Sequence, residues 1–246
     1  MPVRALAARV HRWMGLLVGV QVLLWIAGGV VMSVLPIEEV RSEHKLAEHA
    51  PLAYDPSELI SLEDAARGAG IATVTAGRLD QVAGRPVWVL EASEGSETSV
   101  DAASGQVLSP FGADHAARVA LHDLAIEASI VAVERLEKPV GEYAGPLPAW
   151  RVRFDDGDAT TLYVAAGSGQ VRARRSTTWR FYDLFWRLHV MDYDDGADFN
   201  HPLLIMAALS ALLFALAGIA LLYVRMRQLW LVRAGVRARR KAPSGG

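Results

Sequence analysis

The sequence predicts an α+β domain inserted between two transmembrane α-helices, and three observations lead to this prediction. Two uncharged apolar runs of 23 residues, 13–35 and 202–224, lie near the two ends of the chain. All 27 acidic residues fall between Glu38 and Asp198. The stretch between the apolar runs alternates polar and apolar residues in short segments that are separated by glycine-containing turns, as strands of small antiparallel sheets do.

Each apolar run is long enough to cross a bilayer. A hydrocarbon core of about 30 Å needs about 20 residues of α-helix, and a helix satisfies its own backbone hydrogen bonds in lipid. A cleaved signal peptide is the alternative for the first run. We predict an uncleaved anchor, because the run exceeds the ~7–15 apolar residues of a signal peptide and no A-x-A-like site follows Leu35.

The distribution of charge predicts the orientation. Residues 1–36 carry three Arg and residues 203–246 carry seven Lys or Arg, and neither flank holds an acidic residue. The middle therefore holds 15 basic and 27 acidic residues, a net charge of −12, against +10 on the flanks. Because basic flanks stay in the cytoplasm, both termini are expected there and residues 36–201 on the opposite side.

Small residues in the two runs are candidates for helix packing. Close approach of membrane helices relies on such positions, although small residues are also common in spans that make no contact. Gln21 is the amide within the first run, and we expect it to hydrogen-bond to the second helix. The candidate packing residues are Gly15, Gly19, Gln21, Ala207, Ala211 and Ala215.

The region between the spans contains an internal repeat. Ser104-Gly-Gln-Val107 matches Ser168-Gly-Gln-Val171 at an offset of 64 residues, and Trp88 matches Trp150 at an offset of 62. One repeat therefore has a two-residue insertion between its strands. Each repeat is expected to consist of one helix followed by an antiparallel meander. The expected helices are 61–67 and 113–125, and the expected strands are 72–79, 86–92, 97–101, 106–109, 128–137, 149–154, 160–165 and 170–174.

Seven segments follow from this assignment. They are a cytoplasmic N-terminus (1–12), transmembrane helix 1 (13–35), a degenerate first repeat (36–110), a second repeat (111–176), an interfacial helix with an acidic loop (177–201), transmembrane helix 2 (202–224) and a basic cytoplasmic tail (225–246).

Two groups of motifs resemble a known family. Ala149-Trp-Arg-Val-Arg-Phe-Asp-Asp-Gly157 and the stretch from Tyr163 to Val171 resemble a PepSY domain, of which residues 36–110 form a degenerate second copy. Val10-His-Arg-Trp-Met-Gly15 and Trp186-Arg-Leu-His-Val-Met-Asp-Tyr193 resemble the PepSY-associated membrane helices. The resemblance implies a bacterial inner-membrane protein with a periplasmic PepSY region. Some relatives are iron-regulated, larger four-span relatives take part in siderophore iron reduction, and PepSY domains elsewhere bind or inhibit peptidases.

Histidines near the outer ends of the spans are candidate ligands. Residues 178–190 form an amphipathic pattern typical of an interfacial helix, and His189 lies opposite its charged arc. His189 and His201 are candidates for haem, and His44, His49 and Asp192 for a metal ion. The alternatives are an interfacial histidine bonded to backbone or lipid and a solvated acidic turn. No H-x-x-H or H-E-x-x-H spacing is present, so no cofactor is predicted and haem stays an open alternative.

Several function classes are excluded or disfavoured. The chain has no cysteine, which excludes disulfides, iron–sulfur sites and catalytic thiols. It has no G-x-S-x-G elbow, phosphate loop or dinucleotide fingerprint, so no enzyme activity is predicted. The basic tail follows an apolar run directly, which favours anionic headgroups over nucleic acid as its partner.

We therefore expect a non-enzymatic protein-interaction or regulatory module. Its expected partners are the lipid bilayer and another membrane or periplasmic protein, and a homo-oligomer is an open alternative. A second hypothesis is an accessory subunit of an iron or siderophore reductase, with haem or a metal at the outer membrane face. A third, direct inhibition of a peptidase, follows from the family resemblance alone.

Overall fold

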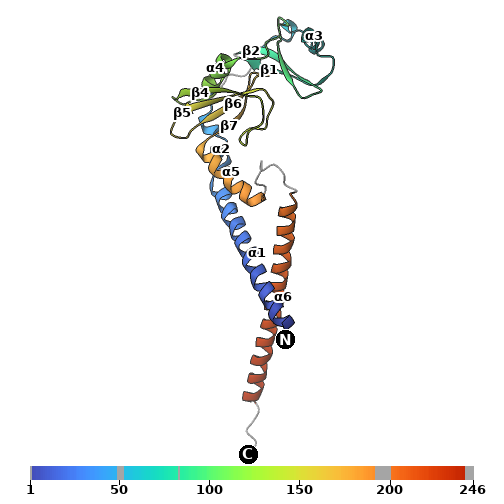
Figure 1. Cartoon of the computed structure of the whole chain (residues 1–246), viewed down its shortest axis with the longest axis vertical. Helices are drawn as coiled ribbons and strands as arrows, with labels where there is room; N and C mark the ends of the chain where they lie inside the picture. Colours follow the sequence, from blue (N-terminus) through green and yellow to red (C-terminus); the bar gives the residue numbers. More distant parts are fainter. Residues whose placement is uncertain (1, 49–52, 83, 192–200, 242–246) are drawn as a thin grey trace, which may run out of the picture. The chain divides into compact units, whose positions relative to one another are not determined.

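The computed structural model describes residues 2–48, 53–82, 84–191 and 201–241. The chain divides into two compact units. The helical unit comprises Met1–Met32 and Phe185–Gly246, and the α+β unit comprises Ser33–Leu184. Figure 1 shows the helices and strands of both units along the chain.

The helical unit contains two helices that are long and apolar enough to cross a membrane. Within α1 (Pro2–Val34) the apolar stretch is Gly15–Val34, with a mean hydropathy of 2.1, and within α6 (Pro202–Lys241) it is Pro202–Ile219, with a mean hydropathy of 2.4. Both helices run beyond the predicted spans. The flanking sequences are rich in Ala, Arg and Leu, which are strong helix formers, so nothing in them stops the helix at the end of the apolar stretch.

The α+β unit begins with short helices and continues as two layered repeats. Its elements are α2 (Ile37–Val40), η1 (Glu43–Lys45), η2 (Pro56–Glu58), α3 (Leu62–Gly68), β1 (Val74–Val82), β2 (Arg85–Ala92), β3 (Glu97–Asp101), α4 (Ala113–Asp123), β4 (Ser129–Leu136), β5 (Ala149–Asp155), β6 (Thr161–Ala165) and β7 (Val171–Arg175). The helix α5 (Thr177–Val190) begins in this unit and ends in the helical unit.

The strands form two antiparallel meanders. The first sheet has the order β1-β2-β3 and the second the order β4-β5-β6-β7, so the predicted α+β class is confirmed. Most boundaries lie within two residues of the prediction. The predicted strand 106–109 is wrong: it forms a single bridge, Val107 with Val100, and Pro110 has no N–H with which to extend the pairing. The next largest difference is β1, which extends to Val82 because the β1–β2 hairpin is tight and Val82 pairs with Arg85. Gly84 in this hairpin has a φ of +77°, a conformation that glycine adopts without strain.

The two sheets carry the same backbone details at matching positions. The amide of Ala102 donates to the carbonyl of Pro86 and that of Ala166 donates to Pro148, each at 2.9 Å. The first strand of each sheet also contains a register shift near its start, between Val74 and Ala76 in one and between Ile130 and Ala132 in the other. The two hydrogen bonds follow the 62- and 64-residue offsets of the sequence repeat, and the two register shifts lie 56 residues apart.

Each helix covers one face of its own sheet. Ala65 of α3 packs on Leu90 and Val100. Ala116 and Ala120 of α4, one turn apart, pack in the larger cluster around Val152, Phe154, Leu162 and Val164. The small side chains let each helix lie close to its sheet, and burial of these apolar faces contributes most of the stabilisation of such small layers.

The two repeats contact each other through the turns between their strands. The Ser99 hydroxyl of the first repeat donates to the carbonyl of Ser168 in the second repeat at 3.3 Å. Ser109 donates its hydroxyl to the carbonyl of Gly167. A Cβ atom at Gly167 would lie 2.2 Å from the carbonyl oxygen of Glu97 in β3, so this contact requires glycine. The repeats therefore meet closely, backbone against backbone.

Candidate functional site

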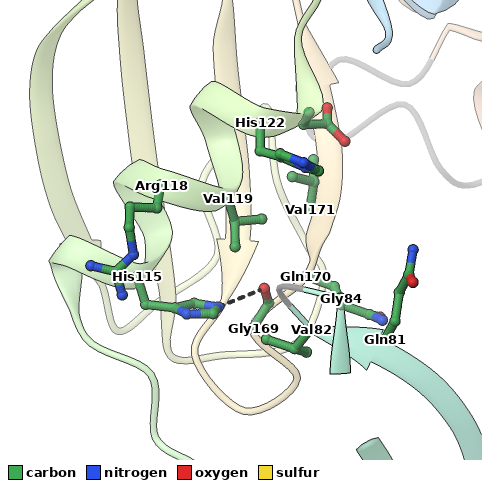
Figure 2. A pocket seen from close by; sticks show the side chains of 11 residues that line it. Gln81, Val82, Gly84, His115, Arg118, Val119, His122, Gly169, Gln170 and Val171 are labelled. Carbon is green, nitrogen blue, oxygen red and sulfur yellow. Dashed lines mark hydrogen bonds between the residues drawn. The ribbon is translucent and has the colours of Figure 1, made fainter. Parts of the chain in front are cut away.

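A cavity of about 550 Å³ opens where the two repeats meet, which is in the size range of ligand sites. Figure 2 shows its walls: the helix α4 on one side and the β1–β2 hairpin on the other, with the β6–β7 turn between them. The lining residues are Gln81, Val82, Gly84, His115, Arg118, Val119, His122, Asp123, Gly169, Gln170 and Val171. Neither repeat forms this cavity alone.

His115 is the most fixed polar group of the cavity. Its Nε2 lies 3.1 Å from the carbonyl oxygen of Gly169, to which it donates, and its ring stacks on Phe111 at 4.1 Å between centroids. Burial lowers the pKa of His115 below its ordinary value; the bond to Gly169 opposes this shift and the charge of Arg118 adds to it. His115 is therefore a neutral hydrogen-bonding wall residue at pH 7.

The helix α4 gives this cavity a basic rim. His115, Arg118 and His122 lie three and four residues apart, which places them along one side of the helix. Arg118 and His122 are exposed, whereas Asp123 is half-buried and forms a bidentate ion pair with Arg174 of β7. The carboxylate nearest the rim is therefore already neutralised.

The wall on the other side is held by an ion-pair network between the repeats. Glu97 of β3 binds Arg172 of β7, and Arg78 lies 3.3 Å from both Glu97 and the Gln170 amide oxygen. Burial raises the pKa of Glu97, but the hydrogen bond and charge of Arg172, with the charge of Arg78, outweigh it and leave the pKa below its usual value. Glu97 is thus ionised and stabilises the repeat interface at neutral pH.

A buried lysine attaches the chain that leaves α1 to the second repeat. Lys45 is 9% exposed, and its Nζ lies 2.7 Å from Asp158, 3.1 Å from Asp156 and 3.0 Å from the Thr160 hydroxyl. Backbone bonds reinforce this attachment: Ala47 donates to the carbonyl of Asp123 at 3.0 Å. The segment after α1 is therefore fixed to both the β5–β6 turn and the end of α4.

The chain that enters α5 is attached to the same turn. Thr177 donates its amide and its hydroxyl to the carbonyl of Asp158, at 2.8 and 3.0 Å. Arg180 donates to the carbonyl of Ala159 at 3.0 Å and forms an ion pair with Glu142 at 2.7 Å. Burial raises the pKa of Glu142, but the hydrogen bond and charge of Arg180 outweigh this effect and leave the pKa below its usual value.

The predicted ligand residues lie in different surroundings in the structure. His44 is exposed in η1, and His201 accepts the amide of Leu203 at 3.3 Å at the start of α6. His49 and Asp192 lie outside the described residues. Across the described ranges, no group of three or more His, Asp or Glu side chains is arranged to hold a metal ion.

His189 packs on the first apolar helix. Its carbonyl accepts the Trp25 indole N–H at 2.9 Å, and the two rings lie 6.5 Å apart. A Cβ atom at Gly28 would lie 3.5 Å from Nδ1 of His189 and 3.4 Å from the carbonyl oxygen of Phe185. Gly28, which the sequence analysis did not select, is therefore the buried glycine on which α5 packs. The pair Gly28-Gly29 is the sequence signal for it.

The predicted packing residues are only partly in contact within the helical unit. A Cβ atom at Gly15 would lie 3.0 Å from the Phe214 ring, whereas one at Gly19 would meet nothing within 4 Å. The Gln21 Nε2 is buried without a hydrogen-bond partner among the described residues, so the expected bond to the second helix is not formed there. The three candidate alanines of α6 differ in solvent exposure: Ala207 and Ala211 are half-buried, and Ala215 is exposed.

Comparisons with known proteins give no relative for this chain: no family model, curated protein or solved structure matches it. The likeness to PepSY domains and their membrane helices therefore rests on the motifs quoted above. What the protein does has to be argued from its own residues.

Proposed function

We propose that this chain is a two-span membrane protein that presents two PepSY-like repeats as a non-enzymatic interaction and regulatory module. The proposed location is the bacterial inner membrane, with both termini in the cytoplasm and residues 36–201 in the periplasm. The apolar helices, the basic flanks and the acidic middle segment support this arrangement.

The observation that carries the proposal is the double attachment of the β5–β6 turn. Lys45, which follows α1, and Arg180, near the start of α5, both bind residues of the turn between Asp156 and Thr161. A display domain on flexible linkers would not need a buried lysine with two carboxylate partners. Because both the segment after α1 and the start of α5 are bonded to this turn, a partner that binds the second repeat and shifts the turn would displace both segments.

The surface available to a partner includes an exposed strand edge. β4 pairs only with β5 in its sheet, and Val131 on this edge strand is 60% exposed. Unpaired edges of small sheets accept an additional strand from another protein.

A topology measurement tests the first part of the proposal. Because the chain has no cysteine, single cysteines placed at Gly141 and at Ser244 report accessibility without background. We expect a membrane-impermeant thiol reagent to label the first in intact cells and the second only after lysis. The opposite pattern would overturn the proposed orientation.

A photo-cross-linking residue at Val131 tests the interaction role. We expect it to trap a periplasmic or envelope protein, and we expect no adduct when the same residue replaces the exposed Glu63 on α3. A Val131→Lys substitution, which places a charge on the edge, is expected to abolish co-purification of the same protein. Equal adducts at both positions would contradict specific recognition through β4.

A second candidate function has one observation in its favour. Nδ1 of His189 is buried without a hydrogen-bond partner among the described residues, beside Trp25. This arrangement supports the proposal of an accessory subunit of an iron or siderophore reductase, in which His189 contacts haem or a partner helix. A haem absorption band in the purified protein that His189→Ala removes, together with recovery of a haem-containing reductase, would favour this function. Colourless protein that takes up neither haem nor metal would exclude it.

A further inference from the structure

A second, smaller pocket lies beside β7 and is lined by four arginines. Its volume is about 360 Å³, and it is formed by β7, the start of α5 and the segment that follows α1. The lining residues are Arg41, Glu43, Leu46, Arg172, Ala173, Arg174, Arg175 and Trp179. Four guanidinium groups and one carboxylate on the lining make this pocket strongly basic.

The guanidinium groups are held in place but are not saturated. Arg172 and Arg174 use part of their donors on Glu97 and Asp123. Arg175 donates Nε to the carbonyl of Glu142 at 2.8 Å and Nη1 to the carbonyl of Arg174 at 2.9 Å, and its guanidinium stacks on Trp179 at 4.1 Å. A guanidinium has five N–H donors, so these bonds fix the groups while leaving donors for another acceptor.

The remaining donors lack acceptors within the described part of the chain. Nε of Arg172 is buried with no hydrogen-bond partner there. Burial lowers the pKa of Arg175, although the charges of Tyr163, Glu142 and Asp183 oppose this shift. Arg41 is 65% exposed along its side chain, and its nearest carboxylate, Glu43, lies at 3.7 Å. An anion in the pocket would accept hydrogen bonds from guanidinium N–H groups and so offset the free-energy cost of their desolvation.

The position of the pocket along the chain favours a lipid as the source of that anion. Arg41 follows the last residue of α1, Val34, by seven residues, which limits their separation to about 25 Å. Trp179 lies at the start of α5, and indole rings favour the membrane–water boundary. Leu46, Ala173 and the Trp179 ring add an apolar wall, which suits an ester group better than a free ion.

We infer that this pocket binds the phosphodiester headgroup of an anionic phospholipid at the outer membrane surface. The arginines contact the phosphate oxygens, and the apolar wall contacts the glycerol backbone, since 360 Å³ is too small for the acyl chains. The inference rests on the proposed topology for its biological setting. Binding itself depends only on the pocket.

The test is a titration of the full chain in non-ionic detergent, followed by native mass spectrometry. The probes are dihexanoyl-phosphatidylglycerol below its critical micelle concentration, dihexanoyl-phosphatidylcholine and inorganic phosphate. We expect one saturable phosphatidylglycerol adduct per chain and weaker binding of the other two. Arg41→Gln is expected to weaken phosphatidylglycerol binding about fivefold, because one phosphate-facing charge is lost, and Arg41→Glu to abolish the adduct.

Arg67→Gln is the matched control, because Arg67 is an exposed arginine on α3 outside the pocket. It is expected to bind as the unmodified chain does, whereas Arg41→Lys retains most of the affinity. Unchanged phosphatidylglycerol binding in Arg41→Glu would overturn the inference, as would inorganic phosphate binding as tightly as the lipid. Cytoplasmic labelling at position 141 would overturn the topology and leave this binding result standing, so the two failures are distinguishable.

Discussion

Trp88 and Trp150 make the same hydrogen bond in the two repeats. The indole N–H of Trp88 donates to the carbonyl of Ile60 at 3.0 Å, and that of Trp150 donates to the carbonyl of Phe111 at 2.9 Å. Each acceptor directly precedes the N-cap residue of the helix in its own repeat, Ser61 or Gly112. The tryptophans therefore fix the start of each helix to an inner strand of its sheet, β2 or β5.

Replacing either tryptophan by phenylalanine is expected to destabilise the α+β unit. The change removes one hydrogen bond and part of a half-buried ring, so we expect a loss of about 1–3 kcal/mol and a fall in Tm of several degrees. Thermal unfolding followed by circular dichroism measures it. Trp230→Phe, at a side chain that is 68% exposed on α6, is the control and should leave Tm unchanged. Equal Tm values for all three variants would show that these indole hydrogen bonds do not stabilise the repeats.

Removal of the buried Lys45 charge is expected to be costly. Lys45→Met leaves Asp156, which is 12% exposed, without its cation, and breaking such a buried pair costs roughly 3–5 kcal/mol. The backbone amide of Ala47 should also exchange faster with deuterium, because its bond to Asp123 depends on the same attachment. Lys138→Met, at an exposed lysine, should change neither quantity. Wild-type exchange at Ala47 in Lys45→Met would contradict the attachment.

The repeat interface should weaken in acid through Glu97. Its pKa lies below the ordinary value in the folded state, so its contribution is complete above the unfolded pKa of about 4.3 and is lost as pH falls through the folded pKa. The difference in Tm between the unmodified chain and Glu97→Gln should therefore be large at pH 7 and shrink below about pH 4. Glu63→Gln, at a carboxylate that is 82% exposed, should show a small difference throughout. A Glu97→Gln difference that does not vary with pH would refute this account.

Gly167 should not tolerate a side chain. A Cβ atom there would lie 2.2 Å from the carbonyl oxygen of Glu97 and 2.9 Å from its carbonyl carbon, and a backbone neighbour cannot rotate away. We expect Gly167→Ala to separate the repeats locally and to lower Tm by many degrees, as overpacking of tight contacts does. At Gly157 a Cβ atom meets nothing within 4 Å, so Gly157→Ala should melt like the unmodified chain. Similar Tm values for the two variants would contradict the close contact.

The contact between α1 and α5 in the helical unit is open to a direct chemical test. A Cβ atom at Gly28 lies 3.6 Å from that of His189, within the 3.5–4.5 Å range of disulfides. The chain lacks cysteine, so a Gly28→Cys, His189→Cys double variant carries no competing thiol. We expect an intrachain disulfide on mild oxidation, detected as two proteolytic fragments that separate only after reduction. The Gly29→Cys, His189→Cys variant is the control, and equal cross-linking in both would argue against packing through Gly28.

Sequence reasoning succeeded where the signal is local. The 64-residue offset of Ser104 and Ser168 predicted two similar sheets. The helix predicted to begin at residue 61 does so, since the Ser61 hydroxyl accepts the Asp64 amide at 3.0 Å. It missed the cavity, although His115, Arg118 and His122 stand at helical spacing, because the opposite wall comes from the β1–β2 hairpin of the other repeat. It also missed Lys45, whose partners are more than 100 residues away.

The sequence by itself determined the apolar helices, the repeated strands and the turns between them, because the spacing of apolar residues and the positions of glycines influence the backbone over only a few residues. Tertiary structure decided which charges meet: Glu97 with Arg172, Lys45 with Asp158, and four arginines around one pocket. These contacts join segments whose separation in sequence leaves no periodic trace, and burial selects them only once the two repeats are packed together.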